Sequence, residues 1–251
     1  MRIVSDHGSG PTVLCLHGSP TAPSSFEGLA ARLAESRRVL VGALPGYAGV
    51  PALSPYDFGS LYAGIEATLL AEAKGPCDLL AFSMGTYHAF AIALRGRVPV
   101  RSIACLGAHP GVGEQDREAL RGAAAAIRAG LVGIDVFAAR MLAPDYLAAH
   151  PQAVARMQSW LDATTVDVVA DELEAFAAAP NLLSEIPKLD ARILARVGAL
   201  DVATPPALSE AVVQAARSAT LEIVPGVGHA LLIEDGPATE RSVLRFLDAA
   251  R

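Results

Sequence analysis

Residues 77–94 read CDLLAFSMGTYHAFAIAL, and this stretch decides the fold. The apolar run over residues 79–82 predicts a buried strand, and the apolar residues 89–94 predict the buried face of a helix. Ser83 stands at the junction. A serine in such a sharp turn has a strained backbone, which lifts its hydroxyl clear of the sheet and sets it at the helix N-terminus.

The residues two before and two after Ser83 must be small, because strand and helix backbones pass close together there. Ala81 and Gly85 meet this demand. Ala-Phe-Ser-Met-Gly resembles the Gly-x-Ser-x-Gly nucleophile elbow of the α/β-hydrolase superfamily, with Ala81 in place of the first glycine. A buried serine that packs a strand end explains the pentapeptide alone equally well, so other motifs must decide between the two interpretations.

The composition predicts a compact globular protein, since 52% of the 251 residues are hydrophobic and 18% are charged. This length fits a single α/β domain with an insertion. A net charge of −6 and the lack of a Lys/Arg cluster argue against a nucleic-acid partner.

Three cysteines without metal-ligand spacing favour buried thiols in a reducing compartment, and neither they nor the histidines predict a metal site. The N-terminus lacks the apolar stretch of a signal peptide. The longest uncharged run, residues 79–94, is shorter than the roughly 18 apolar residues of a membrane span. We therefore expect a cytoplasmic protein with no membrane span.

A predicted strand over residues 12–16 is followed by His17-Gly18-Ser19-Pro20. This His-Gly-x-Pro turn resembles the oxyanion loop of the α/β-hydrolases. The resemblance implies that the N–H groups of Ser19 and Met84 stabilise the oxyanion. His17 precedes the nucleophile in the chain, whereas the family's base follows it, so we interpret His17 as a residue that shapes the loop and borders the pocket.

Other aromatic residues and a histidine are candidates for the substrate pocket. Tyr47 lies in LPGYAG, residues 44–49, which resembles the family's Pro-Gly-aromatic-x-Gly loop, and Phe82 adjoins the nucleophile. His109 follows a predicted strand over residues 100–106; it either lines the pocket or faces solvent in the loop. Trp160 either faces the pocket or packs among the helices around it.

Residues 111–187 predict helices at 115–129, 132–142, 151–161 and 166–178, with no strand among them. Such a helical block between two strands resembles the family's cap. We expect a mostly parallel sheet flanked by helices, the α/β-hydrolase fold, with core residues 1–110 and 188–251 and cap residues 111–187. The cap would follow the sixth strand of the family's sheet. Only one short strand, residues 2–4, fits before residue 12, so the N-terminal strands are trimmed.

The last part of the chain supplies the other two members of a catalytic triad. A predicted strand over residues 191–198 precedes Asp201, and Thr204 is expected to cap the next helix. The pattern Gly-x-x-Asp-x-x-x-Pro resembles the family's site for the triad acid. After a strand at residues 220–224, a glycine-flanked loop holds His229, the only histidine after Asp201. A final helix is expected over residues 237–250.

The resemblance implies a serine hydrolase that cleaves a carboxylic ester, or a related acyl bond, of a small and largely apolar molecule. Ser83 would be the nucleophile, His229 the base and Asp201 its orienting acid, with no cofactor. A carbon–carbon bond hydrolase or lyase with the same triad, and a ligand receptor with slow turnover, stay open as alternatives. An exposed apolar cap surface would favour a homodimer.

Overall fold

The computed structural model describes residues 1–73 and 75–249. Within these residues one sheet has the strand order β1-β3-β2-β4-β5-β6-β7. Only β1 runs antiparallel to its neighbour, β3; the other neighbours are parallel. This is the mostly parallel sheet that the sequence predicted. The strands are β1 (Arg2–His7), β2 (Thr12–Leu16), β3 (Arg38–Ala43), β4 (Cys77–Phe82), β5 (Val100–Leu106), β6 (Arg192–Gly198) and β7 (Ala219–Val224).

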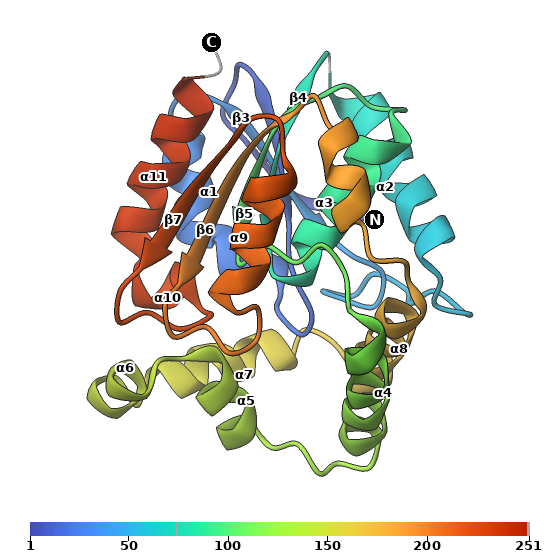
Figure 1. The fold of residues 1–251 in the computed structure, drawn as a ribbon, viewed down its shortest axis with the longest axis vertical. Helices are drawn as coiled ribbons and strands as arrows, with labels where there is room; N and C mark the ends of the chain where they lie inside the picture. Colours follow the sequence, from blue (N-terminus) through green and yellow to red (C-terminus); the bar gives the residue numbers. More distant parts are fainter. Residues whose placement is uncertain (74, 250–251) are drawn as a thin grey trace.

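Helices cover both faces of the sheet (Figure 1). One face carries α2 (Phe58–Glu72), α3 (Met84–Arg95) and α9 (Pro206–Ala215), and the other carries α1 (Glu27–Leu33) and α11 (Gly236–Asp248). Shorter helical segments are the 3-10 turns Pro23–Phe26 and Leu183–Lys188, and α10 (Leu231–Glu234). None of the helices in the described ranges combines the length and apolarity required to cross a bilayer.

The alternation of side chains along the strands divides the core into two apolar clusters. In β2, Leu14 and Leu16 join the cluster under α2 and α3, whereas Val13 and Cys15 join the cluster under α1 and α11. All of these side chains are fully buried. Because both faces are covered, the central strands β2 and β4 are buried throughout and mostly apolar, which explains why the sequence predicts them.

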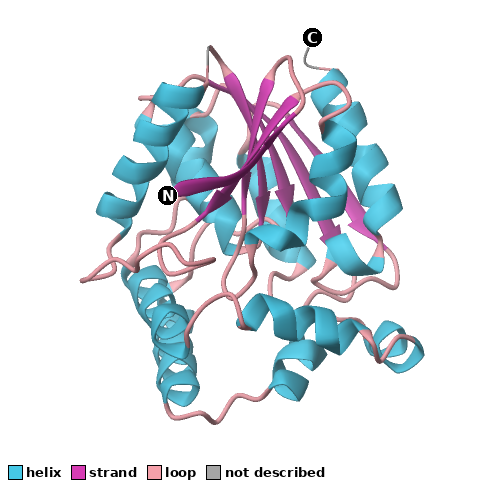
Figure 2. Cartoon of the chain, turned by 180° about the vertical axis from the view of Figure 1, so that it is seen from behind, coloured by secondary structure: helices cyan, strands magenta, loops and turns pink. Residues whose placement is uncertain are grey.

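Between β5 and β6 the chain forms α4 (Glu114–Arg128), α5 (Ile134–Met141), α6 (Pro144–Ala149), α7 (Ala153–Leu161) and α8 (Val166–Ala178). Figures 1 and 2 show these helices at the end of the sheet toward which the parallel strands point. Phe176 of α8 packs into the cluster of α2 and α3, whereas Phe137 and Met141 of α5 pack into the cluster of α1 and α11. This helical insert is thus joined to both faces of the core.

The structure differs from the predicted elements in several places. β1 continues to His7 because it pairs with β3 along its length, with Arg2 opposite Ala43 and His7 opposite Val39. α6 was not predicted. Thr204 does not cap α9, whose N-cap is Pro205; its hydroxyl binds Asp201 instead. The last described helix ends at Asp248, and residue 250, the predicted end, lies outside the described residues.

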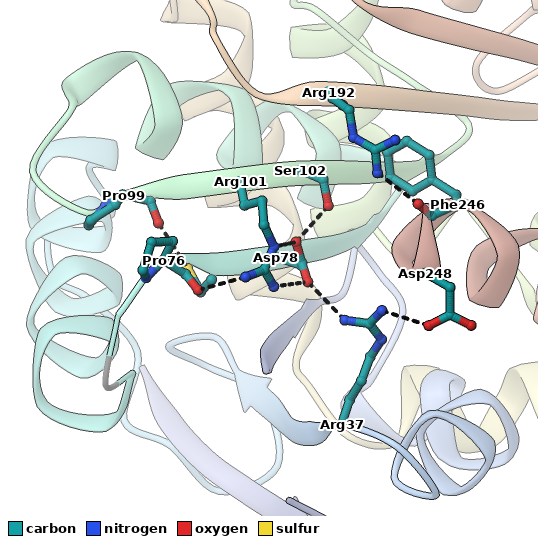
Figure 3. A network of polar contacts seen from close by, with 10 residues as sticks. Arg37, Pro76, Asp78, Pro99, Arg101, Ser102, Arg192, Phe246 and Asp248 are labelled. Atoms are coloured by element: carbon teal, nitrogen blue, oxygen red, sulfur yellow. Dashed lines mark hydrogen bonds and ion pairs between the residues drawn. The ribbon is translucent and has the colours of Figure 1, made fainter. Parts of the chain in front are cut away.

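A buried ion network stabilises the opposite end of the sheet, where the parallel strands begin (Figure 3). Asp78 of β4 is fully buried. It accepts hydrogen bonds from Ser102 at 2.7 Å and from Arg101 Nε at 3.0 Å, and Arg37 Nη1 lies 3.3 Å away. Burying a carboxylate is costly unless it is paired and hydrogen-bonded, and here both oxygens are satisfied.

Candidate active site

Ser83 lies in the turn between β4 and α3 with φ 55° and ψ −127°. A positive φ is strained for a residue with a β-carbon, so the surrounding contacts must hold the turn. The hydroxyl of Thr86 donates to the carbonyl oxygen of Ser83 at 2.7 Å. A β-carbon added at Gly85 would lie 2.3 Å from the Leu16 carbonyl oxygen, so helix and strand approach as closely as the pentapeptide requires. Ser83 keeps 9% of its surface exposed.

The turn after β2 packs directly on this elbow. A β-carbon added at Gly18 would lie 2.7 Å from Cβ of Ser83 and 3.2 Å from the Met84 nitrogen. Met84 is the first residue of α3, so its N–H has no acceptor within the helix. Hydrogen bonds of the turn use the amides of Gly18 and Thr21; the Ser19 amide has no partner in residues 1–73 and 75–249. Two N–H groups are therefore available beside Ser83.

The two turns, one after β2 and one after β4, lie side by side because of the strand order. β2 lies between β3 and β4, so the chain proceeds to one side of β2 first and then to the other. Crevices that bind ligands form at such reversals, beyond the carboxyl ends of parallel strands.

Asp201 and His229 are hydrogen-bonded, with Nδ1 of the imidazole 2.7 Å from Oδ2 of the carboxylate. Asp201 also accepts from the backbone N–H groups of Ala203 at 2.9 Å and Thr204 at 2.7 Å. The Thr204 hydroxyl donates to Oδ2 at 2.8 Å. Burial opposes ionisation of Asp201, but His229 and these donors outweigh it and hold the pKa of the carboxyl below its usual range. The bond on Nδ1 leaves Nε2 on the opposite side of the ring.

His229 lies beside the residues that flank Ser83. The ring of Phe82 stacks on the imidazole with centroids 4.9 Å apart. A β-carbon added at Gly107 would lie 3.2 Å from Cε1 of His229, so the end of β5 borders the ring as well. No hydrogen bond joins the Ser83 hydroxyl to His229 in the described part of the chain; such contacts commonly tighten only when substrate binds.

His17 and Tyr47 are both buried beneath the site. The Leu44 N–H donates to Nε2 of His17 at 3.1 Å, so Nδ1 carries the proton and donates to the Gly18 carbonyl at 2.9 Å. Burial lowers the pKa of His17 to about 4. The ring of Tyr47 packs edge-on against His17, with centroids 4.5 Å apart. A neutral His17 thus fixes two loops, which fits the loop-shaping role expected from the sequence.

His109 and Trp160 lie in different surroundings. His109 is partly buried, accepts from the Gly111 N–H at 3.3 Å and packs edge-on against Phe176 of the insert. Burial, and then the nearby His229, lower its pKa to about 4. Trp160 is fully buried in an apolar cluster with Met141 and Met157 of the insert. His109 therefore lies near the imidazole, whereas Trp160 contributes to packing of the insert.

The sequence assigned no role in the site to three polar residues that the structure brings there. Thr204 binds Asp201 and lies 3.2 Å from His229 Nδ1. Glu234 accepts from the N–H groups of Gly228 at 3.0 Å and Ala143 at 2.9 Å, and so connects the His229 loop to the insert. Glu172 is a buried acid of α8. The sequence contains one indication of Glu172: it is an acid at a position where the helical spacing predicts an apolar residue. Val168, Val169 and Phe176 share its buried face.

No group of three or more His, Cys, Asp or Glu side chains among the residues described could hold a metal ion.

Comparison with known proteins gives the family. The model of the "Alpha/beta hydrolase family" matches residues 13–240, most of the chain. The chain belongs to the alpha/beta hydrolase family. It is a hydrolase enzyme, as the elbow motif and the sheet indicated.

Solved structures show the same fold at low sequence identity. A thermophilic esterase from Thermogutta terrifontis has a TM-score of 0.87 and 22% identity over 98% of this hydrolase and 92% of that chain. The enol-lactonase from Burkholderia xenovorans LB400 has a TM-score of 0.86 and 22% identity over 97% and 95%. MenH from S. aureus has a TM-score of 0.84 and 16% identity over 100% and 99%. No curated protein matches the sequence significantly.

Proposed function

We propose that the protein hydrolyses carboxylic esters, or related acyl bonds, of small and largely apolar molecules through an acyl-enzyme on Ser83. The observation that carries the proposal is the 2.7 Å bond between His229 and Asp201 beside the strained Ser83 turn. A nucleophile, a base and a group that orients the base are the parts that acyl transfer requires.

In the proposed mechanism Ser83 Oγ attacks the acyl carbonyl while His229 Nε2 takes its proton. Asp201 keeps the imidazole in the tautomer with the proton on Nδ1 and stabilises the imidazolium that forms. The imidazolium then protonates the departing alcohol. Water, activated by the same imidazole, hydrolyses the acyl-enzyme and restores Ser83.

The amides of Ser19 and Met84 would stabilise the oxyanion in both steps. Met84 begins a helix of 12 residues, so the positive end of the helix dipole adds to its hydrogen bond. Removing one donor of an oxyanion hole typically lowers kcat by about two to three orders of magnitude.

An apolar substrate is inferred from the side chains that the insert contributes. Phe137 and Met141 share an apolar cluster with Phe82, the residue before the proposed nucleophile. The similar structures include an esterase and an enol-lactonase, both of which act on an ester bond. We take the ester as the bond cleaved and leave the acyl length to experiment.

A fluorophosphonate probe and p-nitrophenyl acetate test the proposal. The wild type is expected to be labelled at Ser83 and to hydrolyse the ester. Ser83→Ala is expected to lose labelling and to lower turnover by roughly three orders of magnitude or more, with its fold intact. Ser159→Ala, which changes an exposed serine, is the matched control. Unchanged turnover in Ser83→Ala would exclude Ser83 as the nucleophile.

A substrate panel then separates the chemistries. Esters, lactones and thioesters of graded acyl length are compared with a vinylogous diketone, which reports carbon–carbon bond hydrolysis. Faster turnover of the diketone than of any ester would exclude the ester assignment. A folded protein that neither labels nor hydrolyses any member would instead be a binding protein.

We further infer a reducing compartment, the cytoplasm, and a homodimer. Cys15, Cys77 and Cys105 are free and buried, which suits a protein that is not oxidised in its surroundings. Leu131, Val132 and Val136 expose 74%, 40% and 59% of their surface on the insert, and a second copy could cover them. Light scattering of the purified protein decides between monomer and dimer.

A further inference from the structure

Glu172 has no part in the proposed mechanism, yet it is a buried acid near the site. The residue keeps 1% of its surface exposed. The Tyr56 hydroxyl donates to Oε1 at 2.8 Å, and the Tyr47 hydroxyl donates to Oε2 at 2.5 Å. A carboxyl group withdrawn from water requires such donors on both oxygens.

The hydrogen bonds of Glu172 continue to the oxyanion turn. The oxygen of the Tyr47 hydroxyl lies 3.3 Å from Ser19 Oγ. The single proton of Tyr47 is used on Glu172, so the serine hydroxyl is the donor in this contact. Burial raises the pKa of Glu172, and the hydrogen bonds donated by Tyr47 and Tyr56 oppose the rise. Glu172 is therefore linked to the residue whose amide is a proposed oxyanion donor.

Other contacts attach the same region of the insert to the loop of Tyr47. The Ala48 N–H donates to the Ala163 carbonyl at 2.8 Å, and the Thr164 hydroxyl donates to the Gly46 carbonyl at 3.1 Å. A β-carbon added at Gly46 would lie 2.5 Å from Val168 Cγ1. Tyr47 is thus confined between α8 and the oxyanion turn.

We propose that Glu172 is a positioning residue which, through Tyr47 and Ser19, fixes the turn at residues 18–21 and so directs the Ser19 amide at the oxyanion. This inference rests on the serine-hydrolase function proposed above. It makes completion of the oxyanion hole depend on the docking of α8. Donors contribute most to catalysis when they are held in place before the reaction, so a looser turn weakens the stabilisation of the transition state.

A role in positioning predicts a particular kinetic pattern. The oxyanion exists only in the transition state and the tetrahedral intermediate. Weakening the hydrogen bond that stabilises it therefore lowers kcat, while KM changes little. Glu172→Leu is expected to lower kcat for p-nitrophenyl acetate by about 10- to 100-fold, less than removal of a donor itself. The inhibition constant of a trifluoromethyl ketone, which forms a tetrahedral adduct with serine, should rise by a similar factor.

Matched variants separate positioning from packing. Glu172→Gln retains one acceptor oxygen and should recover most of the activity. Tyr56→Phe removes a donor from the oxygen that Tyr47 does not bind, and should have a smaller effect than Tyr47→Phe. The losses in Tyr47→Phe and Glu172→Leu should not add in the double variant, because both act through one path. Glu174→Gln, on the exposed side of α8, should match the wild type.

Hydrogen–deuterium exchange tests the same inference without turnover. The peptide that contains residues 18–21 should exchange faster in Glu172→Leu than in the wild type, and at the wild-type rate in Glu174→Gln. If the wild type neither labels nor hydrolyses, the proposed function fails, and exchange still decides whether Glu172 fixes the turn. If Glu172→Leu does not fold, Tyr47→Phe takes its place in both assays.

Two results would overturn the inference. One is a folded Glu172→Leu, or Tyr47→Phe, whose turn exchanges at the wild-type rate. The other is a change confined to KM, with kcat and the affinity for the trifluoromethyl ketone unaltered, which would make Glu172 a residue of substrate binding or of insert packing alone.

Discussion

The ring of Phe82 stacks on the imidazole of His229, with centroids 4.9 Å apart and an angle of 30° between the rings. The residue before the proposed nucleophile therefore holds the proposed base, although 146 positions separate them in the chain. Asp201 fixes the same imidazole through Nδ1 at 2.7 Å. Packing and hydrogen bonding together leave the ring one orientation, with Nε2 on the side opposite Asp201.

Asp201→Asn is expected to lower kcat/KM by about three to four orders of magnitude, because an amide no longer selects the tautomer with the proton on Nδ1. Thr204→Val, which removes one donor from Asp201, should lower it by about tenfold. Ester hydrolysis measures both. Asp190→Asn changes an exposed acid paired with Arg217 and is the control. Equal activity in Asp201→Asn and Asp190→Asn would exclude Asp201 from the triad.

Two glycine-to-alanine changes should have opposite effects on stability. At Gly85 the new β-carbon would lie 2.3 Å from one backbone oxygen and 2.7 Å from another, so Gly85→Ala should lose several kcal/mol or fail to fold. At Gly122, in the middle of α4, the β-carbon meets nothing within 4 Å, and alanine should gain about 0.5–1 kcal/mol. Urea denaturation compares the two. A Gly85→Ala protein as stable as Gly122→Ala would contradict the close approach of helix and strand.

Asp78→Asn is expected to destabilise the protein by about 3–5 kcal/mol, since it leaves the partly buried Arg101 without its counter-charge and buried Arg37 with only the half-exposed Asp248. Activity per folded molecule should not change, because Asp78 lies at the start of β4, whereas Ser83 follows its end. Glu35→Gln removes a surface pair with Arg32, both more than half exposed, and should shift stability by less than about 1 kcal/mol. Similar losses in both variants, measured by urea denaturation, would show that the buried network contributes no more than a surface pair.

Stability should fall as the pH is lowered from 7 to 5. Burial lowers the pKa of His17 to about 4, and burial with the nearby His17 lowers that of His88 to about 3. An unfolded chain restores both to about 6.5, so below that pH unfolding takes up protons and becomes easier. Between pH 7 and pH 5, each of the two histidines should lower the free energy of unfolding by roughly 2 kcal/mol.

Replacement of one histidine isolates this effect from other groups. Burial raises the pKa of Glu172, which acts in the opposite direction, so the total slope alone does not measure the histidines. His88→Leu should flatten the dependence of the urea midpoint on pH, whereas the exposed His7→Gln should leave it as in the wild type. A slope unaltered by His88→Leu would show that His88 binds protons equally in the folded and unfolded states.

The sequence predicted the elements whose signal is local. The strand β2 is a mostly apolar run and was predicted with its observed bounds. The turn at Ser83 was predicted because its small neighbours are close in sequence. Contacts across the fold carry no such signal: Tyr47 and Glu172 are 125 positions apart and meet only after the insert has docked. β1 was underestimated because its length depends on pairing with β3, and its own side chains are mostly exposed.

Thr204 shows a different limit of prediction. A threonine before two prolines is a reasonable helix cap by propensity. In the structure its hydroxyl meets a buried carboxylate three residues earlier, which is a stronger partner than a free N–H at a helix start. The sequence predicted the start of the next helix to within one residue, but it did not predict the partner of Thr204.

The chain leaves β5 for the insert at the end of the sheet opposite the Asp78 network, and it returns to β6, whose first residue Arg192 pairs with Ser102 beside Asp78. The Asp78 network is made by core residues alone, so it does not depend on the sequence of the insert. This arrangement makes residues 111–187 the natural unit for chimeras, in which a helical segment from another hydrolase changes which molecules are accepted. We expect a transplanted segment to need an acid at the position of Glu172, because the recipient would otherwise lose the hydrogen bonds to Tyr47 and Tyr56.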